Sequence, residues 1–183
     1  MRRGLMLLIF IVMLRSWTQL GFVTFIPFYY IDHLKAAPRV VGPLLFLFLG
    51  AGALGNLAAG PMADRWGTRN VMVGGFLASI LPGVVFLKVS GAAAYVVLGV
   101  FGGLLFSTFS ATIVLGQQYL PSRAGLASGL IAGFAIGAGG VGVTCLGWVA
   151  DRFGLLPALW ISALLPIPGF LASMFLPQPS SQR

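Results

Sequence analysis

Acidic side chains are nearly missing from this sequence: three Asp and Glu residues stand among 183, with one histidine and one cysteine. Charged residues make up 8% of the chain, whereas soluble domains carry roughly 25%. The chain therefore cannot build an ordinary water-facing surface. Cys145 stands alone in an apolar segment, which leaves no disulfide framework and no metal pair. Without a nucleophile–base or metal constellation, the sequence predicts no enzyme, no cofactor and no metal site.

Apolar residues are abundant instead, at 58% of the chain, and the mean hydropathy is +1.00. These values predict a protein surrounded by lipid. The net charge of +8 comes from cations scattered singly, as expected for the flanks of membrane spans rather than for a nucleic-acid surface. The start MRRGLMLLIFIVML resembles a signal peptide, but no small-residue cleavage site follows it. An uncleaved first span is therefore predicted.

Six apolar segments reach or approach the length of about 20 residues that a helix needs to cross the hydrocarbon core. They are predicted to be helices, because lipid cannot satisfy open backbone groups. The connections are short and polar, so no separate soluble domain is expected. The predicted fold is an all-α membrane protein with six transmembrane helices. The expected spans are Gly4–Ile31, Val40–Ala63, Val71–Leu87, Ala92–Leu115, Ala124–Ala150 and Leu155–Leu176.

Two octapeptides share one pattern: GPMADRWG at Gly60–Gly67 closes the second span, and GWVADRFG at Gly147–Gly154 closes the fifth. Each half then holds three helices, with Asp-Arg after its middle helix. Because three is odd, the copies should lie on opposite faces of the membrane. This predicts a 3+3 inverted repeat, which is typical of secondary transporters. We expect repeats at residues 1–90 and 91–176 and a polar tail at 177–183. The alternative is that the pattern is only a convenient helix stop.

The basic residues favour cytoplasmic termini, because cytoplasmic loops carry an excess of Lys and Arg. With the N-terminus inside, six basic residues fall on the inner side and four on the outer side. The inner group is Arg2, Arg3, Arg65, Arg69, Arg123 and Arg183, and the outer group is Lys35, Arg39, Lys88 and Arg152.

The repeated octapeptides also predict a conformational latch. A carboxylate at the membrane interface can face the positive N-terminus of another helix, and the next arginine supplies a counter-charge. The last glycine permits the turn. Such a contact would favour one state of a rocking transporter, whereas the alternative is a static anchor among the headgroups. The predicted latch residues are Gly60, Asp64, Arg65, Gly67, Arg69, Asp151 and Arg152.

The stretch GPMADRWGTR resembles the loop signature of the major facilitator superfamily, in which a glycine is followed by Asp-Arg, a second glycine and basic residues. Asn70 stands where a second basic residue would be usual. Residues Phe109–Gly154 are similar to the fosmidomycin-resistance branch of that family. There, a glutamine-containing helix end, a Leu-Pro-x-Arg turn and a glycine-dense helix follow in the same order.

The resemblance implies helices seven to twelve of a twelve-helix drug-efflux transporter of the inner membrane, working by proton-coupled alternating access. Its partners would be the lipid bilayer, a small anionic or drug-like substrate and a second six-helix half. That half would come from a separate chain or a homodimer, or else this chain is a fragment. No acid lies mid-membrane here, so a coupling carboxylate is expected in the other half. The competing hypothesis is a non-transporting six-helix membrane partner or a truncated remnant of a transporter.

Arg15 is the most informative residue for a substrate site. It lies roughly 17 Å into the first span, near mid-membrane, where a charge is costly and usually faces a cavity or a partner. Gln19 and Tyr30 continue its helical stripe, and a buried arginine suits an anionic oxygen cluster. The alternative is that the helix begins near Met13 and that Arg15 extends to the inner headgroups.

The fourth and fifth spans hold further candidates. Ser107 and Ser110 share a face and are expected either to line the cavity or to bond their own helix backbone. Asn56 in the second span is expected to hydrogen-bond a neighbouring helix. Glycines at strict four-residue spacing form a smooth ridge, which predicts close helix packing against the partner half. This ridge consists of Gly125, Gly129, Gly133 and Gly137.

Overall fold

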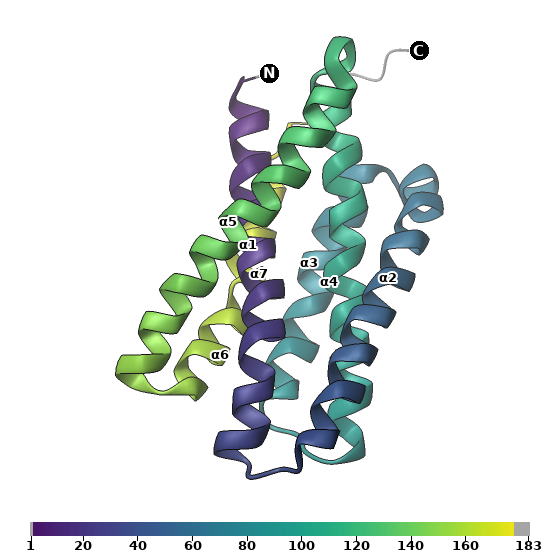
Figure 1. Ribbon diagram of the computed structural model, residues 1–183. Coiled ribbons are helices and arrows are strands. Elements are labelled where there is room, and N and C mark those ends of the chain that lie inside the picture. The colour runs from purple at the N-terminus through teal and green to yellow at the C-terminus, as the bar shows by residue number, and fades with distance from the viewer. Residues whose placement is uncertain (1, 178–183) are drawn as a thin grey trace.

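In the computed structural model, which describes residues 2–177, long α-helices are joined by short turns (Figure 1). No β-strand occurs in this part of the chain. A π-helical turn extends the first helix, and short 3-10 turns precede the second and fifth helices. In order, the elements are α1 (Arg2–Phe28), η1 (Tyr29–His33), η2 (Pro38–Val40), α2 (Val41–Trp66), α3 (Thr68–Phe86), α4 (Ala92–Tyr119), η3 (Pro121–Arg123), α5 (Ala124–Phe153), α6 (Leu155–Leu164) and α7 (Pro166–Met174).

Within the described residues, six helical stretches are long and apolar enough to cross a membrane, which confirms the predicted fold class. The sixth stretch, Leu155–Met174, comprises both α6 and α7. The helix breaks at Leu165 because Pro166 has no N–H to donate and its ring crowds the preceding turn. Most of the predicted tail, residues 178–183 including Arg183, lies outside the described residues, as does Met1.

Both octapeptides are helical for longer than expected. α2 runs through Trp66 and α5 through Phe153, so each Asp-Arg pair lies in the last helical turn rather than in a loop. A single glycine then ends each helix, with φ of 83° at Gly67 and 96° at Gly154. Side chains other than glycine rarely adopt this backbone conformation, which explains why the helix stops there.

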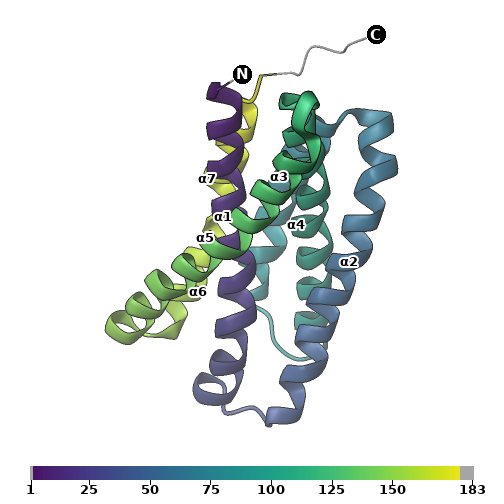
Figure 2. The same cartoon turned by 45° about the horizontal axis from the view of Figure 1, so that its top comes forward.

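The directions of the helices agree with an inverted arrangement. α2 and α5 run in opposite directions, so their C-terminal ends lie at opposite ends of the bundle (Figure 1). The start of α1 and the end of α7 lie at one common end (Figure 2). The division of the chain into repeats at residue 90 stays a prediction.

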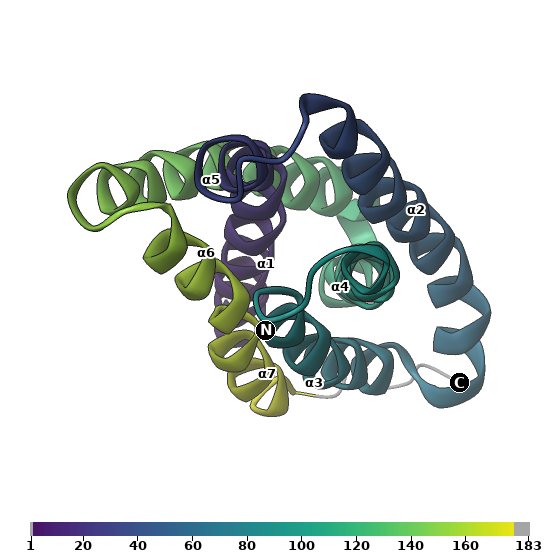
Figure 3. The same ribbon diagram turned by 90° about the horizontal axis from the view of Figure 1, so that it is seen from below.

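Viewed along the bundle, α4 is surrounded by α1, α2, α3 and α5 (Figure 3). Glycines bring α2 and α4 into close contact. A Cβ atom at Gly102 would overlap the backbone carbonyl of Phe48, and one at Gly55 would overlap the carbonyl of Gly103. Small residues at such contacts let helix backbones approach closely, which is how helices associate in lipid.

Two apolar clusters fill the bundle, one toward each end of α1. One cluster contains an aromatic group in which the rings of Phe22 and Phe101 lie 4.6 Å apart. The other includes Leu8 and Ile11 at the opposite part of α1. Arg15 lies between these clusters along the helix, beside a cavity with mainly apolar walls.

Candidate functional site

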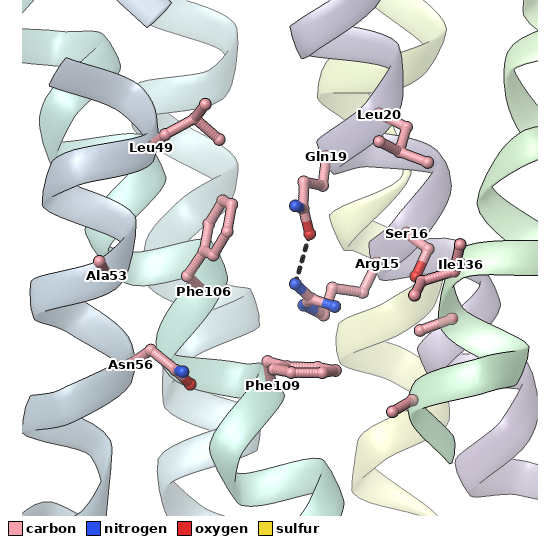
Figure 4. Close-up of a pocket in the computed structure, with 12 residues that line it drawn as sticks. Arg15, Ser16, Gln19, Leu20, Leu49, Ala53, Asn56, Phe106, Phe109 and Ile136 are labelled. Carbon is pink, nitrogen blue, oxygen red and sulfur yellow. Dashed lines mark hydrogen bonds between the residues drawn. The ribbon is translucent and has the colours of Figure 1, made fainter. Parts of the chain in front are cut away.

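A cavity of about 410 Å³ lies among α1, α2, α4 and α5 (Figure 4). Its walls are mainly apolar, and they include Phe106 and Phe109 from α4. A few polar groups enter a largely apolar space, as is usual for small-molecule sites. The polar residues are Arg15, Ser16, Gln19 and Asn56.

Arg15 is the only charged residue among those that line this cavity. α1 begins at Arg2, which places Arg15 about 20 Å along the helix at 1.5 Å per residue. Its side chain is 3% exposed and lines the cavity instead of extending to one end of the bundle. Arg15 thus lines a cavity in this structure, and its role in binding a substrate stays a prediction.

Aromatic rings and one amide hold the guanidinium in place. Its central carbon lies 4.4 Å from the ring centroid of Phe109 and 5.5 Å from that of Phe106. Both distances allow cation–π attraction. One guanidinium nitrogen, Nη2, donates a hydrogen bond of 2.5 Å to Oε1 of Gln19, four residues along α1 (Figure 4). The cation thus lies over both aromatic rings, and its N–H groups are left for polar contacts.

Nε of Arg15 is buried and has no hydrogen-bond partner among residues 2–177. A charge in the bilayer interior costs about 2.5–3.5 kcal/mol on insertion scales. A cation kept there with an unused donor is suited to an oxyanion, which accepts paired N–H bonds from arginine.

Asn56 lines the opposite wall of the cavity, from α2, and its amide points toward Phe109 (Figure 4). The sequence predicts a hydrogen bond from this residue to a neighbouring helix. Instead, its buried Oδ1 has no partner within the part of the chain that the structure describes. Asn56 thus belongs to the cavity, which the sequence analysis did not predict.

Three predicted substrate residues do not line this cavity. Tyr30 packs in the aromatic cluster, stacked on Phe86 with ring centroids 6.3 Å apart, because the helical stripe of Gln19 continues into that core. Ser107 donates to the carbonyl of Leu104 at 2.7 Å, so it follows the backbone-bonding alternative. Ser110 is half-buried and also lies outside the lining.

Phe106 and Phe109 were not predicted from the sequence as part of the site. The predicted candidates in this stretch of α4 were hydroxyl residues, but the two phenylalanines line the cavity instead. Their three-residue spacing puts both rings on one helix face, and this was the available signal.

The predicted latch residues do not gather in one place. Gly60, Asp64, Arg65 and Gly67 are exposed at the end of α2, and Asp151 and Arg152 are exposed at the end of α5. Arg152 packs over the ring of Trp148, with its guanidinium carbon 5.4 Å from the centroid. The latch role stays a prediction for both sites.

Arg69 makes a contact that the latch hypothesis did not include. From the first turn of α3 its Nη2 donates to the carbonyl of Met174, the last residue of α7, at 2.5 Å. Cations near a helix C-terminus stabilise the unpaired carbonyls there. In this structure Arg69 therefore holds α7 against α3.

The glycine ridge faces away from the bundle. A Cβ atom placed at Gly125, Gly129, Gly133 or Gly137 would meet no atom of the described chain within 4 Å, and all four are exposed. By contrast, Gly142 on another face of α5 lies against Trp17 of α1. The ridge is thus free of contacts within residues 2–177.

A bundle of six apolar spans with an arginine-containing cavity between its helices defines a multi-pass membrane protein with an internal polar site. A family model described as Major Facilitator Superfamily matches residues 5–183. The chain belongs to the major facilitator superfamily, and its fold is that of a half-domain of this family.

Several transporters are similar to this chain. The uncharacterized MFS-type transporter YfnC of Bacillus subtilis is 37% identical over 87% of the chain and 38% of YfnC. The fosmidomycin resistance protein of Escherichia coli is 40% identical over 73% of the chain and 32% of that protein. The probable nitrate/nitrite transporter NarK2 of Mycobacterium tuberculosis is 31% identical over 65% of the chain and 29% of NarK2. The chain thus spans less than two fifths of the length of each relative.

Proposed function

We propose that this chain is the C-terminal half of a drug-efflux transporter whose substrate is a small anion bound at Arg15. The observation that carries the proposal is the buried guanidinium in the cavity, which lies over two aromatic rings and whose Nε has no partner within residues 2–177. The similarity to a fosmidomycin resistance protein supports drug efflux, because fosmidomycin is a phosphonate and thus an oxyanion.

A second six-helix half would complete the transporter. Supporting this, the cavity is bounded by α2 and α5, and the exposed glycine ridge lies on α5. Exposed glycines let a second helix approach the backbone closely, and a smooth surface suits helices that slide during alternating access.

The Asp-Arg pairs suit contacts with that second half. Asp64 lies in the last turn of α2, at the negative end of its own helix dipole, where a carboxylate is unfavourable. The N-terminus of a partner helix would compensate for this cost in one conformation only. Proton coupling, as in efflux members of the family, would use a carboxylate of the partner half.

We also propose cytoplasmic termini in the bacterial inner membrane. To test the orientation, Trp66 and Trp148 are replaced singly by cysteine in a Cys145→Ser chain, and intact cells are treated with a membrane-impermeant maleimide. Cysteine at position 148 should react and cysteine at position 66 should react only after lysis, because α2 and α5 end at opposite ends of the bundle. Equal labelling of both positions in intact cells would contradict the inverted arrangement.

The transport proposal is tested by co-producing the chain with the part of the Escherichia coli fosmidomycin resistance protein that it does not match. Cells with both pieces should tolerate fosmidomycin and export it, and a protonophore should stop export. The controls are cells with either piece alone. If the two pieces associate in the membrane but move no fosmidomycin and no other phosphonate, the competing hypothesis of a non-transporting membrane partner is supported instead.

A further inference from the structure

Two residues that line the same cavity, Arg15 and Asn56, each carry a buried polar atom that has no partner within residues 2–177. Nε of Arg15 is a donor and Oδ1 of Asn56 is an acceptor, and both are buried without a partner within residues 2–177. Buried polar groups in native proteins are nearly always hydrogen-bonded, so each such exception calls for a ligand or a functional reason. Both side chains point into the cavity from opposite walls, α1 and α2 (Figure 4).

The two atoms need opposite hydrogen-bonding functions from a ligand. Arginine only donates, so it requires acceptor oxygens, and the amide oxygen of asparagine only accepts, so it requires an O–H or N–H. The oxygen of Gln19 accepts from Arg15 and cannot donate to Asn56, and no donor of the described residues bonds Oδ1 of Asn56. The rings of Phe106 and Phe109 bring no strong donor or acceptor.

We infer that Asn56 determines specificity by accepting a hydrogen bond from the transported anion, so the substrate class is a small oxyanion that also carries a hydroxyl or N–H donor. Its anionic oxygens bind the edge of the Arg15 guanidinium, and its donor reaches Oδ1 of Asn56 across the cavity. An anion with acceptor atoms alone leaves this amide oxygen unpaired. The inference rests on the proposed function, since it assumes that Arg15 binds the anion.

The melting temperature of the protein without ligand provides an independent test of this role for Asn56. Asn56 stands in an apolar span and gains no partner for its oxygen from the described chain. Leucine has a similar branched shape and no polar atom, so Asn56→Leu should leave the melting temperature unchanged or raise it. If a residue that lines a cavity lowers the stability of the protein, a functional role explains why it is there.

The test uses the full chain in lipid nanodiscs and isothermal titration with matched phosphonates. The probes are hydroxyalkylphosphonates of one to three carbons, each paired with the alkylphosphonate that has a methyl group in place of the hydroxyl. In the unaltered chain, at least one hydroxyl probe should bind about tenfold more tightly than its methyl partner, because the methyl compound leaves a buried acceptor unpaired.

In Asn56→Leu and in Asn56→Ala this preference should fall to about twofold or less, while the methyl probe keeps its affinity. The matched control is Asn70→Leu, since the Asn70 amide is exposed and bonds the carbonyl of Trp66 outside the cavity. This control should keep the full preference.

Two different failures are distinguishable. If both probes bind equally in the unaltered chain, yet binding is lost in Arg15→Ala, the role of Asn56 is wrong and the anion site stands. The same holds if the preference survives in both Asn56 variants. If neither probe binds, or if Arg15→Ala binds as the unaltered chain does, the proposed anion site itself is wrong.

Discussion

Replacing Arg15 by alanine should lower phosphonate export by about 100-fold, because hydrogen bonds to charged groups contribute about 1.5–3 kcal/mol each and an oxyanion would lose two of them. The reason lies in the geometry of the site. The guanidinium lies over two rings and bonds Gln19, its Nε is unpaired within residues 2–177, and the described lining holds no second cation that could replace it.

Arg15→Lys should recover only part of the activity, leaving export about tenfold below that of the unaltered chain. Lysine restores the positive charge but not the planar fork that binds two oxygens. The measurement is export of labelled fosmidomycin from cells that contain the two co-produced pieces.

The control for the Arg15 series is Arg123→Ala, which removes an exposed arginine outside the cavity and should leave export unchanged. Protein levels and melting temperatures separate transport from folding. Arg15→Ala removes a charge that is costly in lipid, so its melting temperature should not fall. Export of Arg15→Ala close to the unaltered level would show that the substrate does not depend on this cation.

Placing leucine at Gly129 and Gly133 together should weaken association with the second half by about 100-fold, since overpacking a close contact costs about 1–3 kcal/mol per site. A Cβ atom at either position would meet no atom of residues 2–177 within 4 Å, so the six-helix bundle itself should fold and insert normally. Association is measured by co-purification of the two pieces and by export of fosmidomycin, and both should be lost together.

Two further glycines give matched controls for the ridge. Gly74 on α3 is also exposed and open, so Gly74→Leu should change neither folding nor association. Gly142 lies against Trp17, so Gly142→Leu should destabilise the chain itself and lower its melting temperature. If the Gly129 and Gly133 variant associates as well as the Gly74 variant does, the ridge faces lipid and the second half binds elsewhere.

Apolar segment length was enough to predict the architecture, because lipid admits only elements that satisfy their own backbone groups. The residues at which the helices end were harder to predict. The polar stretches after Ala63 and Ala150 suggested loops, yet both helices continue until a glycine with positive φ ends them. Side-chain polarity marks the edge of the membrane, whereas the backbone hydrogen bonds decide where a helix ends.

In the candidate site, residues that share one helix could be predicted together, whereas residues from different helices could not. Arg15 and Gln19 were predictable together, because residues four apart share a helix face and a deep charge is costly. Ser107 looked equally suitable, but a hydroxyl can bond its own helix, and here it does. Asn56 and the two phenylalanines come from other helices, so their meeting with Arg15 is not encoded in any local spacing.

The sequence by itself determined that this is a membrane protein with six spans. It also determined that two oppositely oriented copies of an Asp-Arg motif end the second and fifth spans. Those properties follow from the apolar composition and length of each segment and from the repeated motif, all of which can be read without knowing how the helices pack. Only the tertiary structure decided that Arg15 and Asn56 line one cavity and that the ridge on α5 faces outward. These contacts depend on how the surfaces of α1, α2, α4 and α5 fit together. The sequence of one helix alone therefore does not predict them.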